Sequence, residues 1–133
     1  MIKKIMMLVL TMVVGLSLTG NAEATSKAGV SVNTTKSNYT ASDGYVTLAI
    51  KNDNNYNVGV EIQPQIKSNG KWNDLDWYDV EFVNKGKKVY NKTSIKEFKT
   101  GEYRYQITIN TYDKDGYVKD SKKVNNSNFK VKR

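Results

Sequence analysis

The stretch GEYRYQITINTYD, Gly101 to Asp113, carries the clearest β-strand pattern in this chain of 133 residues. Its side chains alternate between two faces, and this period of two is that of a strand with one buried face. The first face carries Tyr103, Tyr105, Ile107, Ile109 and Thr111. The second face carries Arg104, Gln106, Thr108, Asn110 and Tyr112. The sequence therefore predicts that the first set packs into a core and that the second set faces solvent.

The segments after this strand also follow a β pattern. Residues 113–116 (DKDG) predict a tight turn, because Asp and Gly tolerate turn geometry, and the turn leads into a hairpin partner over residues 117–124. Residues 128–132 then predict a last strand at the edge of a sheet, with Phe129 and Val131 on one side.

The segments before it alternate in the same way. Residues 45–51 place Val46, Leu48 and Ile50 on one face, and residues 58–66 alternate again up to the Asn69-Gly70 hairpin signal. Pro64 has no backbone N–H to donate. Its strand is therefore predicted to lie at a sheet edge or to carry a bulge.

Seven to nine short strands result, with turn signals about every ten residues and no helical pattern after residue 24. The predicted fold class is therefore all-β, and the pattern is typical of an antiparallel β-sandwich or a barrel. Residues 25–133 suit one domain with one core, because two domains of half that length would each bury too little apolar surface.

The stretch Thr100 to Tyr105 (TGEYRY) resembles the entry to the penultimate strand of immunoglobulin-like domains. In those domains a tyrosine two residues after a glycine, here Tyr103 after Gly101, caps a nearby backbone group. Tyr105 stands where antibody domains place their second cysteine. The chain is similar to small secreted immunoglobulin-like proteins of Bacillus-type bacteria, most of which have no assigned function. The resemblance implies an immunoglobulin-like sandwich and no particular activity.

Residues 1–24 are predicted to be a signal peptide. Lys3 and Lys4 precede an apolar run of about 14 residues, and Ala22-Glu23-Ala24 offers small residues for cleavage after Ala24. The run is shorter than the roughly 20 residues of a membrane-spanning helix. The prediction is a secreted, extracellular protein without a stable membrane anchor; the alternative is an uncleaved anchor.

Cysteine and histidine are both absent. A secreted domain of this size without cysteine indicates a bacterial protein that does not rely on disulfides. Without histidine and cysteine the chain lacks the commonest general base, the thiol nucleophile and the commonest metal ligand. The sequence therefore predicts no enzyme, no cofactor and no metal. Residues 113–124 do not complete a calcium-binding EF-hand loop, because Tyr117 and Val124 stand where oxygen ligands are needed.

Carboxylates gather only in the segment DLDWYDVE, residues 74–81. A pair of carboxylates beside aromatic rings is the minimal equipment of a glycosidase. Such residues are more often the polar face of an exposed strand. A small carbohydrate-active enzyme is thus the remote alternative.

Two groups of residues are predicted to bind a ligand. The aromatic group contains Trp72, Trp77 and Tyr78, whose rings can stack on sugars or bases, although Trp72 also suits the core tryptophan of a sandwich and Trp77 a place at the core's rim. The basic group lies in the last hairpin and tail and includes Lys114, Lys119, Lys122, Lys123 and Lys130. These lysines predict either one basic edge that docks on an anionic polymer or a guard against edge-to-edge aggregation. A further group comprises Lys85, Lys87, Lys88 and Lys92.

The net charge of +8 favours anionic partners. Only Arg104 and Arg133 are arginines, so the bidentate forks of specific phosphate or nucleic-acid recognition are nearly absent. We expect a secreted, non-enzymatic binding module whose partner is an anionic cell-wall polymer or another protein. The alternative is a secreted inhibitor or toxin-like effector that acts on a protein or a membrane. The oligomeric state stays open.

Overall fold

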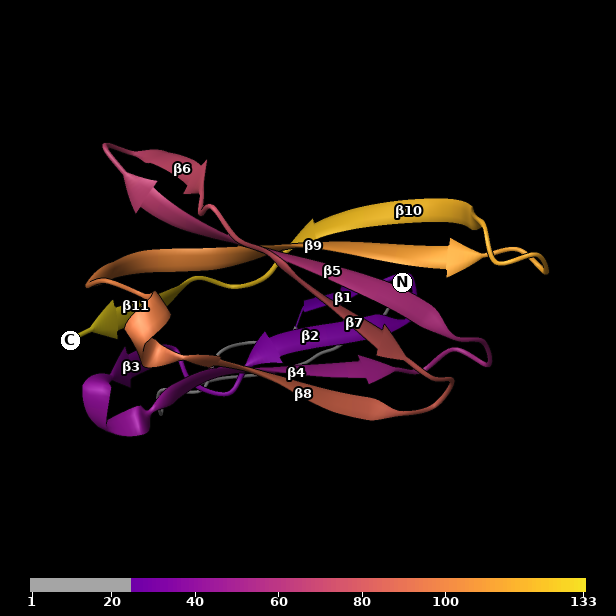
Figure 1. Cartoon of the computed structure of the whole chain (residues 1–133), viewed down its shortest axis with the longest axis horizontal. Coiled ribbons are helices and arrows are strands. Elements are labelled where there is room, and N and C mark those ends of the chain that lie inside the picture. The colour runs from indigo at the N-terminus through magenta and orange to yellow at the C-terminus, as the bar shows by residue number, and fades with distance from the viewer. Residues whose placement is uncertain (1–24) are drawn as a thin grey trace.

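A computed structural model describes residues 25–133, which form two β-sheets packed face to face as a sandwich (Figure 1). The predicted signal peptide and its cleavage site lie in residues 1–24, outside the described residues. Eleven strands and two short 3₁₀ turns make up the described part of the chain. Within residues 25–133, no helix is long and apolar enough to cross a membrane.

The first sheet, which we call sheet A, has four antiparallel strands in the order β1-β2-β4-β8. Their bounds are β1 Thr25–Lys27, β2 Val30–Thr34, β4 Tyr45–Asn52 and β8 Lys88–Ser94. The 3₁₀ turn η1 (Ala41–Asp43) precedes β4, and η2 (Ile95–Glu97) follows β8.

The second sheet, sheet B, is built around β5 and β9, which pair with each other over eight residues of each strand. The other side of β9 pairs first with β11 and then with β10, and the other side of β5 pairs with β7 and then with β6. The bounds are β3 Asn38–Thr40, β5 Val58–Ser68, β6 Lys71–Asp74, β7 Asp79–Val83, β9 Gly101–Tyr112, β10 Val118–Asn125 and β11 Phe129–Lys132.

This arrangement corrects the expected count of seven to nine strands and the expected purely antiparallel pairing. The count rises because β1 and β3, each only three residues long, are too short to show an alternating pattern. The last strand, β11, is not at an edge, because it lies between β9 and β3. Its pairing with β3 is parallel, with Val131 opposite Tyr39.

Pro64 does not mark an edge or a bulge of its own strand. It lies in the middle of β5, where its partner on β9 is Tyr105. On the other side, β7 ends its pairing at Ile62 and β6 begins at Gln65. The missing N–H therefore falls where the neighbouring strand is interrupted, and the Pro64 carbonyl accepts a hydrogen bond from the Leu75 amide at 3.0 Å. The prediction of an edge was wrong, because the break lies in the partner.

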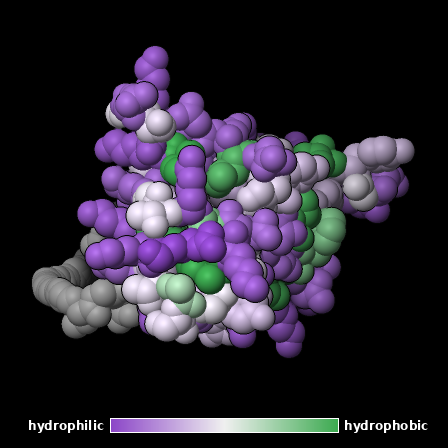
Figure 2. Space-filling model, turned by 60° about the vertical axis from the view of Figure 1, so that its left-hand side comes forward, coloured by the Kyte–Doolittle hydropathy of each residue, from purple (hydrophilic) through white to green (hydrophobic). Residues whose placement is uncertain are grey.

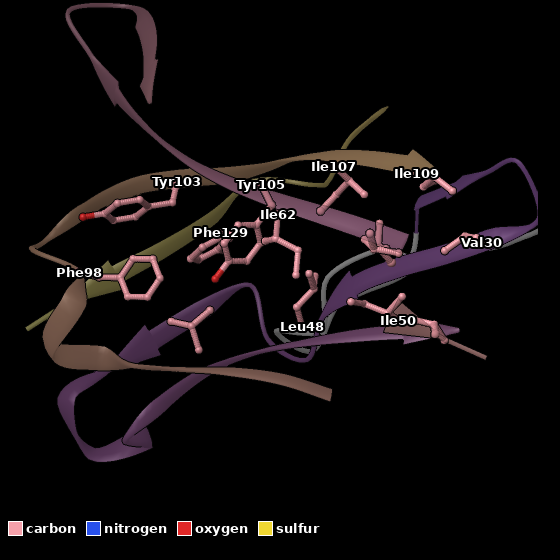
Figure 3. Close-up of a cluster of buried hydrophobic side chains, with 14 of the residues drawn as sticks. Val30, Leu48, Ile50, Ile62, Phe98, Tyr103, Tyr105, Ile107, Ile109 and Phe129 are labelled. Atoms are coloured by element: carbon pink, nitrogen blue, oxygen red, sulfur yellow. The ribbon is translucent and has the colours of Figure 1, made fainter. Parts of the chain in front are cut away.

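The core lies between the sheets and contains the predicted inward face of β9 (Figure 3). Tyr103, Tyr105, Ile107 and Ile109 are buried there against Phe129 of β11 and against residues of β4 such as Leu48. The polar face of β9 points outward, as the alternation predicts, with Arg104, Gln106 and Thr108 partly exposed. The end of the strand differs from the prediction, because Asn110 is buried and Thr111 is partly exposed.

Tyr103 and Tyr105 use their hydroxyl groups differently. The Tyr103 hydroxyl donates a hydrogen bond of 2.7 Å to the Lys99 carbonyl, just before the strand. Burial raises the pKa of the Tyr105 hydroxyl far above its usual range, so this group stays neutral inside the sandwich.

Candidate functional site

The candidate site lies on the outer face of sheet B, which is the side turned away from sheet A. The strand register brings Gln63 of β5 opposite Gln106 of β9. In the next outward row, Glu61 lies opposite Thr108, which in turn lies opposite Lys123 of β10. Residues far apart in the sequence thus form a continuous polar surface across three strands.

This surface is hollowed into an open depression of about 280 Å³. Side chains of β5, β9 and β10 line it, and the segment that joins β6 to β7 contributes to its rim. The lining residues are Glu61, Ile62, Gln63, Asp74, Tyr78, Gln106, Thr108 and Lys123. We call this feature the sheet B depression.

Hydrogen bonds fix the outer-face side chains on two sides of the depression. On one side, Ser121 donates to Asn110 at 2.5 Å, and Asn110 donates to Glu61 at 2.6 Å. On the other side, Arg104 donates to Gln65 at 2.7 Å, and Gln65 donates to Asp74 at 2.8 Å. Because Asn110 and Gln65 are buried, both carboxylates are held in place without a ligand.

Three side chains of the depression remain available. Gln106, Thr108 and Lys123 make no side-chain hydrogen bond or ion pair with another described residue. They offer an amide, a hydroxyl and an ammonium group from neighbouring positions on β9 and β10. This combination suits a ligand rich in hydroxyl groups.

Trp72 lies on the outer face and not in the core. The interpretation of Trp72 as the core tryptophan of the sandwich was therefore wrong. It belongs to β6, in a hairpin that extends beyond the body of the sandwich (Figure 1). The Arg104 guanidinium carbon lies 4.5 Å from the centre of its ring, and the Lys67 ammonium lies 5.9 Å away. The ring is thus half-buried beneath cations at one end of the outer face.

The structure separates Trp77 from Tyr78, which are adjacent in the sequence. Trp77 is half-buried at the rim of the core, with its ring edge-on to Phe98 at 5.8 Å, as its alternative reading predicted. Tyr78 turns outward to the sheet B depression and is 65% exposed.

Val80 and Phe82 of β7 are also exposed, by 39% and 71%. On the face drawn in Figure 2, hydrophobic groups form separate areas between hydrophilic ones.

The predicted lysine group does not form one basic edge. Of its members, Lys123 alone lines the depression, while Lys122 is on the opposite side of β10, near Asp120 at 3.7 Å. Lys119 lies at the irregularity in the β9–β10 pairing. Lys114 is in the turn of that hairpin, and Lys130 lies opposite Glu102 in the register of β9 and β11, at the far end of the sheet. These lysines are separated because β10 and β11 pair with opposite ends of β9.

The carboxylates of residues 74–81 are divided in the same way. Asp79 and Glu81 share a face of β7, and both accept hydrogen bonds from Asn91, at 2.7 and 2.8 Å. Asp74 is in the depression, bound to Gln65. No three carboxylates of residues 25–133 lie close enough together to hold a metal ion.

The Asp113 carboxylate accepts hydrogen bonds from the amides of Asp115 and Tyr117, so it stabilises the predicted hairpin turn.

Sequence reasoning missed Gln63, Gln106 and Thr108 as site residues. The signal for two of them was present, because the alternation in β9 already places Gln106 and Thr108 on the outward face.

Comparison with models of known protein families finds no match for this chain. A search of curated proteins likewise finds no significant match.

Proposed function

We propose that this protein is a secreted, non-enzymatic binding module that holds a polysaccharide of the cell surface on the outer face of sheet B. The observation that carries the proposal is the sheet B depression. There the side chains of Gln106, Thr108 and Lys123 make no hydrogen bond or ion pair with another residue of 25–133, and they lie beside the exposed ring of Tyr78.

The chemistry of these groups fits a sugar chain. The Gln106 amide and the Thr108 hydroxyl can each donate to and accept from sugar hydroxyls. The Glu61 and Asp74 carboxylates supply further acceptors. The Lys123 ammonium supplies a further donor, and the Tyr78 ring offers a flat apolar surface for a sugar ring. A concave site with a few placed polar groups and an aromatic wall is the usual form of a small-ligand site.

Export is the second part of the proposal. It is supported by the order of residues 1–24: two lysines, an apolar run, then Ala22-Glu23-Ala24. If the chain is expressed in a bacterium that secretes it, N-terminal sequencing of the protein in the culture medium should begin at Thr25. A secreted chain that still begins at Met1 would contradict cleavage.

The immunoglobulin-like character of the sandwich is the third part. Two observations support it beyond the TGEYRY stretch. The Tyr103 hydroxyl caps the Lys99 carbonyl, as the tyrosine of the resembled domains caps a backbone group. The sheets also divide the strands in an immunoglobulin-like way, with β2, β4 and β8 in one sheet and β5, β9 and β10 in the other.

The binding test uses isolated bacterial cell walls from which the phosphate polymers have been removed by acid. We expect the double variant Tyr78→Ala/Gln106→Ala to bind these walls about tenfold or more weakly, since it removes the ring and one polar contact near the centre of the site. The measurement is the fraction of protein that sediments with the walls over a range of wall concentrations.

The matched control is Tyr45→Ala/Asn33→Ala, which removes the same kinds of groups from sheet A. It should bind as the parent chain does. High salt should weaken parent binding only in part, because screening acts on the contribution of Lys123 and not on ring or hydroxyl contacts. Equal losses in the two variants, or no retention of the parent chain, would refute the proposed site.

An inhibitor or toxin-like effector that acts on a protein is the second candidate function. Phe82 favours it, because its ring is 71% exposed at the end of the outer face, opposite Gly59 and beyond the depression. Digesting the walls with a protease separates the two candidates. A protein target would be lost on digestion, whereas a polysaccharide would keep its ability to retain the chain.

A further inference from the structure

The two sheets differ sharply in their charged residues. The strands of sheet A contain lysines but no Asp or Glu. These lysines are Lys27, Lys51, Lys88 and Lys92. The strands of sheet B other than β3 and β11 contain acidic residues, mixed with basic ones in all but β7: Glu61, Asp74, Asp79, Glu81, Glu102 and Asp120. The positive charge of the protein is therefore not balanced locally on sheet A.

Three of these four lysines, Lys51, Lys88 and Lys92, lie on β8 or on its neighbour β4. Lys88, Tyr90 and Lys92 alternate along β8 and are exposed, while Val89 and Asn91 between them point inward. Lys88 lies directly opposite Lys51 of β4. Like charges opposite each other on a sheet are destabilising, so the fold keeps an unfavourable pair at this position.

The nearby carboxylates neutralise little of this charge. Asp53 pairs with Lys51 at 2.9 Å, and Asp43 pairs with Lys36. Lys88 has no carboxylate partner among the described residues, and its ammonium lies 5.3 Å from the centre of the Tyr90 ring. Lys92 likewise makes no ion pair with a described residue.

We propose that the outer face of sheet A is a second binding surface, which takes a linear phosphate polymer of the cell surface along β8. The charge complementarity is the argument for this occupant. Lysine presents a compact point charge and not the planar fork with which arginine selects one phosphate geometry. Lys88 and Lys92 are about 13 Å apart along the strand, a distance that a flexible chain of repeated phosphates matches without a pocket. The surface stands independently of the proposed polysaccharide site, which lies on the opposite side of the sandwich.

The test uses medium-chain inorganic polyphosphate as the probe and compares two triple variants with the same loss of charge. Lys51→Gln/Lys88→Gln/Lys92→Gln removes the sheet A lysines. Lys114→Gln/Lys119→Gln/Lys122→Gln removes three exposed lysines of β10 and its hairpin turn, all outside the sheet B depression, as the matched control. At about 0.1 M salt, where charges act over about 10 Å, titration calorimetry gives the dissociation constants.

We expect the sheet A variant to bind polyphosphate at least about tenfold more weakly, because each lysine at an anionic surface contributes about a factor of five. The β10 variant should lose less than about threefold. Both variants should keep the melting temperature of the parent chain to within a few degrees, since the replaced side chains are exposed.

Three results would overturn the proposal: equal losses in both variants, no binding of polyphosphate by the parent chain, or tighter binding of oligothymidine of equal charge. Failure here is distinguishable from failure of the polysaccharide site. The sheet A variant should still be retained on phosphate-free walls, and Tyr78→Ala/Gln106→Ala should still bind polyphosphate.

Discussion

Phe129→Ala should lower the free energy of unfolding by about 3–5 kcal/mol, as removal of a fully buried aromatic ring does. The ring is completely buried and contacts four others, those of Tyr39, Phe98, Tyr103 and Tyr105, at centroid distances of 5.2 to 6.0 Å. Its loss leaves a cavity between β11 and the opposite sheet that these rings can fill only in part. Denaturation by urea, followed by tryptophan fluorescence, measures the change.

Phe82→Ala is the matched control for this measurement. It removes the same side chain from a position that is 71% exposed, so we expect a change within about 0.5 kcal/mol. Typical domains are stable by only about 5–15 kcal/mol, and the Phe129 variant should therefore be near the limit of folding. A cost below about 1.5 kcal/mol would show that β11 does not close the core as described.

Asn52→Ala should cost about 2–3 kcal/mol, because a buried side chain with several hydrogen bonds is lost and its partners are left unpaired. Asn52 is fully buried at the end of β4. Its amide donates to the carbonyls of Tyr56 and Val83 at 2.8 and 3.1 Å, and its oxygen accepts from the Asn54 amide at 3.0 Å. These bonds connect sheet A, the loop before β5 and the end of β7.

Asn125→Ala provides the comparison, since Asn125 is exposed on β10 and makes no side-chain hydrogen bond with a described residue. It should change the free energy of unfolding by less than about 0.5 kcal/mol. Urea denaturation again gives the difference. Equal effects at the two positions would mean that Asn52 does not hold the loop.

The pattern in β9 was predictable because it is local. Alternation over twelve residues assigns Tyr103 and Ile107 to the core and Gln106 and Thr108 to the surface, and burial confirms this assignment. The turn at residues 113–116 was predictable for the same reason, since Asp113 fixes it through its own neighbours.

Pairing between distant strands was not predictable from local patterns. Pro64 predicts an edge when β5 is considered alone, and only the gap between β6 and β7 shows how a central strand accommodates it. The parallel pairing of β3 with β11 joins residues about ninety positions apart, and β3 is too short to show a period. Trp72 and Trp77 are only five residues apart, yet Trp72 lies on the outer face and Trp77 at the rim of the core. They differ because β6 ends at Asp74, between them.

The same reason limits prediction of the candidate site. Of the residues predicted to bind, Tyr78 and Lys123 meet in the sheet B depression, while Trp72 lies beyond it and Trp77 packs on the core. The depression needs the register of β5, β9 and β10 together. Composition indicated aromatic and basic groups, but only the register shows which of them share a surface.

The most direct test of the central claim is a titration of the ¹⁵N-labelled protein with soluble glycan fragments released from phosphate-free cell walls, followed by backbone amide chemical shifts. The polysaccharide site predicts that the largest changes fall on Gln63, Gln106, Thr108 and Lys123, with the amides of β2 and β4 unmoved. Changes confined to sheet A or to the hairpin turn at residues 113–116, or no changes at saturating fragment concentration, would contradict it.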